Sequence, residues 1–126
     1  MAFEITGEFI KKIHEYAIDA GVHDESSLRC LTRDEGTIEY IADKSCEFIN
    51  IVEKASFCLF SIANYHPFVE GNKRTAILVA EVILGNHLHI DVNGEELNGF
   101  VRKIATPDGT YEETLIWMQS NVRIKK

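Results

Sequence analysis

The sequence is poor in the features that would assign it to a special class of protein. It has only two prolines, Pro67 and Pro107, and neither opens a linker, so we expect one domain over residues 1–126. Its three cysteines are odd in number and widely spaced, which argues against a disulfide framework and a zinc site and for reduced thiols. No apolar run is long enough to span a bilayer, and the N-terminus lacks the pattern of a signal peptide. These absences predict a cytoplasmic globular protein.

The charge balance limits the partners. Acidic residues outnumber basic ones 20 to 13, which gives a formal charge of -7. Such a surface repels nucleic-acid backbones and anionic lipids, so we expect neither nucleic-acid nor membrane binding. A local basic pair can still bind phosphate, and Lys73 with Arg74 is the best candidate outside the C-terminal tail.

Hydrophobic periodicity predicts six helices. They are expected at residues 6–20, 24–31, from 43 or 45 to 64, 72–84, 93–104 and from 110 onward. The helix over 72–84 has one polar residue, Glu81, between Ala76 and Leu84, so we expect it at the centre of the domain. The first helix is expected to present one apolar stripe made of Phe9, Ile13, Tyr16, Ala17 and Ala20.

Local signals fix several element boundaries. Asn93 precedes Glu96, and Thr110 precedes Glu113, so each pair predicts a helix start. Gly85 is suited to end the helix over 72–84. Residues 37–41 and 87–92 alternate between polar and apolar side chains, which predicts two short extended segments. The expected fold class is all-α, a compact bundle of about six helices around a buried central helix, with a short β-hairpin flap.

The segment from His66 to Arg74 carries the residue types that phosphoryl or nucleotidyl transfer requires. The first turn of a helix has unpaired backbone N–H groups, which bind anions readily. Gly71 permits a tight turn and a close approach of a ligand. Lys73 and Arg74 add positive charge where phosphate oxygens would lie. We therefore expect a phosphate-binding site at this helix start.

Two further side chains in the segment complete the chemistry. Glu70 offers a carboxylate beside the phosphates, the usual way in which a protein holds Mg²⁺ with its substrate. The imidazole of His66 is a side chain suited to take a proton from an attacking hydroxyl. Pro67 stiffens the turn, and Phe68 is expected to anchor the loop in the core. The sequence has no P-loop, protein-kinase or dinucleotide-binding motif.

This segment resembles the Fic/Doc signature H-x-F-x-(D/E)-G-N-G-R-x-x-R. The matching residues are His66, Phe68, Glu70, Gly71, Asn72 and Arg74. Lys73 stands at the second glycine of the Fic form and Ile77 at its second arginine, and both departures are typical of the Doc (death on curing) branch. The resemblance covers most of the chain, including residues 23–31, 53–55 and 91–117.

The resemblance implies a Fic/Doc-type fold and a Doc-like toxin, a Ser/Thr phosphotransferase that moves the terminal phosphate of ATP onto a protein hydroxyl. The target would be elongation factor Tu, and translation would stop. His66 would be the base and Glu70 the Mg²⁺ ligand. The phosphates would be held by Gly71, Asn72, Lys73 and Arg74, and the target would dock on a flap made of Thr37, Ile38, Glu39, Tyr40 and Ile41.

Two other functions stay open. A Fic-like enzyme would transfer AMP instead, and Gly71 favours this because the founding Doc has alanine there. A non-catalytic module that binds a nucleotide or an antitoxin belongs to a different class. The chain lacks the Fic inhibitory pattern (S/T)-x-x-x-E-(G/N), so the resemblance implies a separate, Phd-like antitoxin.

Each candidate residue also has an ordinary structural interpretation. A lone histidine at a helix end is more often structural than catalytic, and only the surrounding motif favours a base at His66. Glu70 alone would be a common first-turn acid that stabilises the helix dipole. We expect the other four histidines to be surface residues and Trp117 to be a core residue. The four histidines are His14, His23, His87 and His89.

Overall fold

The computed structural model describes residues 4–21 and 31–125, which form six helices and one two-stranded antiparallel sheet. In chain order the elements are α1 (Gly7–Gly21), α2 (Glu35–Ser45), α3 (Ile51–Tyr65), α4 (Asn72–Leu84), β1 (Leu88–Ile90), α5 (Gly94–Ile104), α6 (Tyr111–Asn121) and β2 (Val122–Ile124). The expected all-α class is confirmed. The helix expected at residues 24–31 lies outside the described residues except for Leu31.

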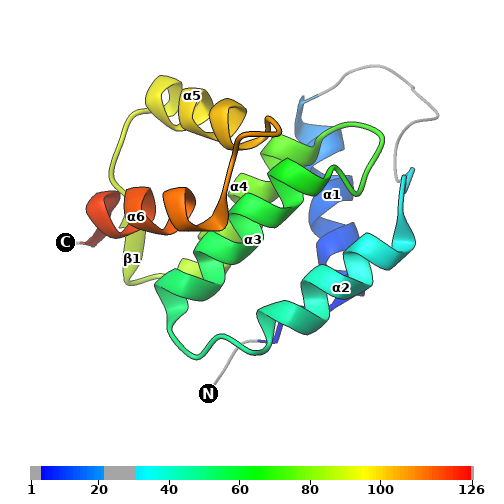
Figure 1. Ribbon diagram of the computed structural model, residues 1–126, viewed down its shortest axis with the longest axis horizontal. Coiled ribbons are helices and arrows are strands. Elements are labelled where there is room, and N and C mark those ends of the chain that lie inside the picture. Colours follow the sequence, from blue (N-terminus) through cyan, green and yellow to red (C-terminus); the bar gives the residue numbers. More distant parts are fainter. Residues whose placement is uncertain (1–3, 22–30, 126) are drawn as a thin grey trace.

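The centre of the fold is α3, not α4 as the sequence predicted. Every residue of α3 from Lys54 to Ala63 is buried. The helix runs through the middle of the molecule, with α1 and α2 on one side and α5 and α6 on the other, and α4 packs along its length (Figure 1). The polar Glu81 and its neighbour Val82 are exposed on α4. The low polarity of α4 thus reflects a helix that is buried around most of its circumference but has one exposed face.

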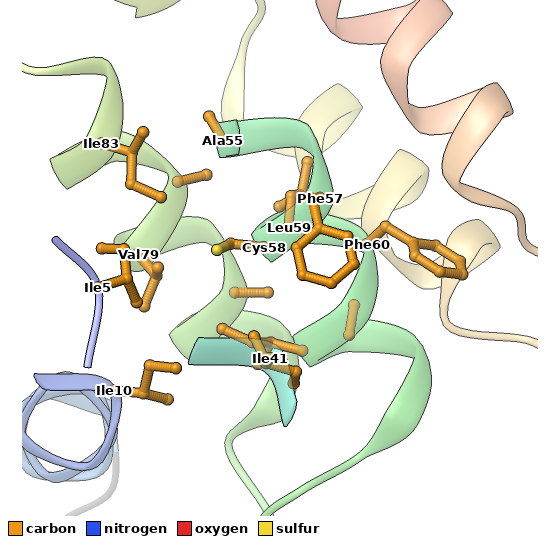
Figure 2. Packing of buried hydrophobic residues seen from close by; sticks show 14 of the residues in the cluster. Ile5, Ile10, Ile41, Ala55, Phe57, Cys58, Leu59, Phe60, Val79 and Ile83 are labelled. Carbon is orange, nitrogen blue, oxygen red and sulfur yellow. The ribbon is translucent and has the colours of Figure 1, made fainter. Parts of the chain in front are cut away.

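The hydrophobic core joins the first four helices. Ile10 from α1, Ile41 from α2 and Val79 from α4 point toward Leu59 and Cys58 of α3 (Figure 2). All of these side chains are buried. Because burying each large aliphatic side chain contributes roughly 1.5–3 kcal/mol, this cluster provides much of the stability that holds the α3–α4 loop in place.

The local helix-start signals are confirmed. The side chain of Asn93 accepts a hydrogen bond from Glu96 N at 2.7 Å, and Thr110 Oγ1 accepts one from Glu113 N at 3.1 Å. Gly85 ends α4 with a φ of 78°. These interactions join residues only a few positions apart, which is why the sequence alone reveals them.

Residues 37–41 were expected to be extended, but they lie in the helix α2. Asp34 caps this helix by accepting a hydrogen bond from Thr37 N at 3.2 Å. Ile38 and Ile41 are buried, whereas Tyr40 is half exposed, which is a spacing of three that suits a helix. The prediction of a β-hairpin flap at residues 37–41 is therefore wrong. The two strands of the fold are instead β1 and β2, which pair from Leu88↔Ile124 to Ile90↔Val122.

One helix boundary and the buried face of α1 also differ from expectation. The helix expected from residue 43 or 45 to 64 is two helices, because the chain turns after Ser45 and α3 begins anew at its cap, Asn50. On α1 the buried face includes Ile10, His14 and Ile18, while Tyr16 is 62% exposed. Among the residues described, no helix combines the length and apolar character that crossing a membrane requires.

Candidate active site

The loop between α3 and α4 begins at His66, which has an unusual backbone conformation. His66 caps the C-terminus of α3 with φ 52° and ψ 60°, and it is the only non-glycine residue of the described part with a positive φ. A left-handed conformation at a residue with a Cβ costs free energy and persists where its surroundings hold it. Arg33 does so: its Nη1 donates to the carbonyl oxygens of His66 at 3.0 Å and Tyr65 at 3.4 Å.

The segment that leads into α2 holds the next part of the loop (Figure 1). The backbone N–H groups of Arg33 and Asp34 both donate to the carbonyl oxygen of Pro67, at 2.8 and 3.1 Å. Thr32 and Phe68 form an isolated antiparallel bridge beside these bonds. His66 thus lies between a helix end and a short β-type contact, and both restrict its backbone.

Asn72 closes the loop with its side-chain amide. Its Oδ1 accepts a hydrogen bond from Phe68 N at 2.9 Å, and its Nδ2 donates to Phe68 O at the same distance. Asn72 is buried, as is Phe68, which anchors the loop in the core as predicted. Both polar atoms of the Asn72 side chain thus bond to the loop backbone, while its backbone N–H lies in the first turn of α4.

His14 is the residue that the sequence interpretation missed. It was expected at the surface, but it is fully buried on α1. Its Nε2 lies 2.8 Å from the carbonyl oxygen of Glu70, and its ring stacks on Phe68 with centroids 3.8 Å apart. Burial lowers the pKa of His14, against the smaller opposing effects of the bond to Glu70 and of the Glu70 and Glu15 carboxylates. No local signal could reveal this, because the partner lies 56 residues away.

Gly71 is required both by the backbone and by packing. Its φ is 83°, a conformation that residues with a Cβ rarely adopt. A Cβ at this position would lie 2.9 Å from Cδ1 of Ile18 and 3.4 Å from the His14 ring. The glycine therefore lets α1 pack directly against the loop, in addition to the close ligand approach that the sequence predicted.

The N-terminus of α4 differs from the starts of the other five helices. Among the described helices, α1, α2, α3, α5 and α6 each have a side chain that accepts a hydrogen bond from the first turn, whereas α4 has none. Lys73 and Arg74 are exposed on this turn, and neither has a polar partner among the described residues. Open N–H groups and two cations make this turn attractive to anions.

A cleft of about 530 Å³ opens next to this helix start. It runs between α1, α4 and α5, and its lining includes Tyr16, Lys73, Arg74, Ile77, Leu78 and Leu97. The exposure of Tyr16, which contradicted the predicted stripe, is explained by its position in the wall of this cleft. His66 and Glu70 do not line the cleft. Lys73 and Arg74 do, and they directly follow the loop in the sequence, so they lie between the cleft and the loop.

Glu70 and the predicted flap residues complete the set of sequence candidates. Glu70 is half-buried beside the α4 start, and the described residues contain no cluster of His, Cys, Asp or Glu that could hold a metal by itself. One carboxylate fits an ion that takes its other ligands from phosphates and water. Residues 37–41 lie on α2, where the ring of Tyr40 is 6.4 Å from that of Tyr65, the residue before His66.

His87 and His89 lie at or beside β1, away from the loop. His87 is exposed, and His89 lies 3.5 Å from the carboxylate of Asp91, a partner that the sequence interpretation did not recognise. His23 lies outside the described residues. Trp117 stacks on Phe100 with centroids 4.1 Å apart and packs against the core, as expected.

Comparison with known families agrees with the geometry of the loop. The model of the Fic/DOC family matches residues 4–84, which is more than half of the chain. The chain belongs to the Fic/DOC family. The matched residues run from the start of α1 to the end of α4 and include every contact of the loop described above. A search of curated proteins gives no match.

Membership of the Fic/DOC family indicates the general chemistry. Its proteins are usually transferases that act on other proteins, and they use ATP as substrate, generally with Mg²⁺. An open helix N-terminus, two unpartnered cations, one carboxylate and one histidine at a rigid turn fit this chemistry. The match is to the family as a whole.

Proposed function

We propose that this chain is a Doc-like toxin, a phosphotransferase that moves the terminal phosphate of ATP to a serine or threonine hydroxyl of a protein. The observation that carries the proposal is the start of α4, which lacks a side-chain cap and bears Lys73 and Arg74. Backbone N–H groups and the helix dipole attract phosphate there, and the arginine can bind two oxygens at once. The positive charges of Lys73 and Arg74 lie within one helical turn, which suits the binding of a single phosphate group.

The residue at position 77 supports transfer of phosphate over transfer of AMP. Ile77 stands where the Fic form of the motif has its second arginine, and it lines the cleft together with Leu78 and Leu97. An apolar wall favours a nucleoside and does not favour a row of phosphates. With the base in the cleft and the phosphate tail directed to Lys73 and Arg74, the terminal phosphate would lie closest to the loop.

The reaction requires one proton acceptor and one displaced group. His66 would accept the proton of the target hydroxyl through its imidazole, and the hydroxyl oxygen would form a bond to the terminal phosphorus. The bond from that phosphorus to the bridging oxygen would break, and ADP would leave. Lys73 and Arg74 would stabilise the charge on the transferred group. Glu70 would hold Mg²⁺, which when bound neutralises charge on the phosphate oxygens.

The target and the inhibitor follow from the resemblance of the motif to the Doc branch. We propose elongation factor Tu as the target, so that modification arrests translation. We propose as inhibitor a separate, Phd-like antitoxin chain. The surface that surrounds His66 is available to a protein partner, since Tyr40, Tyr65 and Val69 are each more than a third exposed.

ATP labelled separately at the α and γ phosphates tests the proposal with the purified chain, elongation factor Tu and Mg²⁺. We expect label on the protein target from the γ position only, and none with His66→Ala. Label from the α position only would overturn phosphate transfer and support AMP transfer, which the Fic-like Gly71 favours. If His66→Ala stayed as toxic to growing cells as the unaltered chain, the protein would be a binding module instead.

A further inference from the structure

The contacts of His14 connect the first helix to the proposed metal ligand. His14 is buried beneath the loop, its ring stacks on Phe68 with an interplanar angle of 3°, and its Nε2 lies 2.8 Å from the carbonyl oxygen of Glu70. A carbonyl oxygen can only accept, so Nε2 carries the hydrogen and donates it. Burial of the ring favours its neutral form, which then carries its single hydrogen on the nitrogen that faces the loop.

The other ring nitrogen shows that His14 is not an efficient core filler. Nδ1 of His14 is buried and has no hydrogen-bond partner among the described residues. An unpaired buried acceptor is unfavourable, and phenylalanine could stack on Phe68 without this penalty. The feature of His14 that an apolar ring would lack is the bond to the carbonyl oxygen of Glu70.

This bond restricts the backbone directly before the open start of α4. Glu70 is followed by Gly71, and because glycine has no Cβ, the peptide between them has more accessible orientations than it would before another residue. The other loop contacts act on His66, Pro67, Phe68 and the N–H of Val69, which lie further toward α3. His14 is the described side chain that holds the Glu70 peptide itself.

We propose that His14 is a positioning residue for the metal site: by fixing the carbonyl of Glu70, it aims the Glu70 carboxylate at the ion that accompanies the nucleotide. This inference rests on the proposed function, in which Glu70 holds Mg²⁺. Hydrogen bonds that orient a ligand residue commonly change metal affinity by 10–100-fold, and a bond to the backbone of the ligand acts at the low end of that range.

Three substitutions separate the donor from the ring. His14→Phe keeps an aromatic ring on Phe68 but removes the donor to Glu70. His14→Gln removes the ring but keeps an N–H that reaches about as far as Nε2. His14→Asn has a shorter amide that reaches only the place of Nδ1, so it replaces His14→Phe if that variant does not fold. Circular dichroism and urea denaturation of each full-length variant establish that it is folded under the conditions of the binding measurement.

The measurement is the binding of Mn²⁺, followed by electron paramagnetic resonance, with and without a non-hydrolysable ATP analogue. We expect the analogue to induce Mn²⁺ binding by the unaltered chain. We expect His14→Phe to weaken Mn²⁺ binding on the order of tenfold, and His14→Gln to weaken it no more than about threefold. Affinity for the analogue without metal should be unchanged in both, because Lys73 and Arg74 are intact.

Two results would overturn the inference while leaving the proposed function intact. One is equal Mn²⁺ affinity in His14→Phe and the unaltered chain. The other is equal weakening in His14→Phe and His14→Gln, since the ring rather than the donor would then matter. If the unaltered chain bound the analogue but no Mn²⁺ with it, the proposed role of Glu70 would fail, and the inference would fall with it.

Discussion

Asn72 offers the sharpest test of how the loop is held. Replacing it with alanine removes both hydrogen bonds to Phe68, each 2.9 Å long, and leaves the N–H and C=O of a buried residue without partners. Each unpaired buried group costs about 1–3 kcal/mol, so the free energy of unfolding should fall by about 2–6 kcal/mol. Since a domain of this size is stable by about 5–15 kcal/mol, this is a large part of the total.

Urea denaturation followed by Trp117 fluorescence and by circular dichroism measures the change. With an m-value of about 2 kcal/mol/M, the midpoint should fall by roughly 1–3 M. Asn72→Asp should be no better than alanine, because it keeps an acceptor for the Phe68 N–H but sets a carboxylate against the Phe68 carbonyl. Asn98→Ala, an exposed asparagine on α5, is the control and should change stability by less than about 0.5 kcal/mol. A loss below about 0.5 kcal/mol for Asn72→Ala would refute the role of Asn72 as a loop clamp.

Three further outcomes are expected. Burial lowers the pKa of His14, so the unfolded chain takes up a proton at a higher pH than the folded chain does, and the folded state loses stability below about pH 6.5. Between about pH 7.5 and about pH 5.5, the urea midpoint of the unaltered chain should therefore fall relative to that of His14→Phe. Gly71→Ala should lower the free energy of unfolding by about 2–3 kcal/mol, and in a double-mutant cycle Ile18→Val should recover about 0.5–1 kcal/mol of this loss. Strictly additive effects would contradict the predicted contact between the added Cβ and Ile18. Calorimetry should show ATP binding weakened on the order of tenfold by Lys73→Ala and unchanged by Lys12→Ala, and equal effects would argue against phosphate at the α4 start.

The sequence predicts those parts of the fold that depend on neighbouring residues. Asn93 and Thr110 cap helices through residues three positions later, so their signals are complete within one turn. The loop from His66 to Arg74 is likewise contiguous, and its residues lie where the motif predicts: at a helix end, in a glycine turn and on a helix start.

Contacts across long sequence distances were not predictable. His14 looks like any polar residue on a helix until Phe68 and the Glu70 carbonyl lie beside it. Residues 37–41 fit a period of two as well as a period near three, and only the packing of Ile38 and Ile41 against the core decides for the helix. β2 is three residues long, too short to show a period. Its partner β1 is separated from it in the sequence by α5 and α6.

The bond between His14 and Glu70 has a consequence for the order in which the protein assembles. The helices α3 and α4 adjoin each other in the chain and can form early, whereas closing a contact over 56 residues costs more chain entropy and comes late. A chain in which α1 has separated from the loop would keep most of its helices but would have a loosely held Glu70. The loop at the site would therefore become ordered only when α1 docks, which is the same event that buries Ile10 in the core.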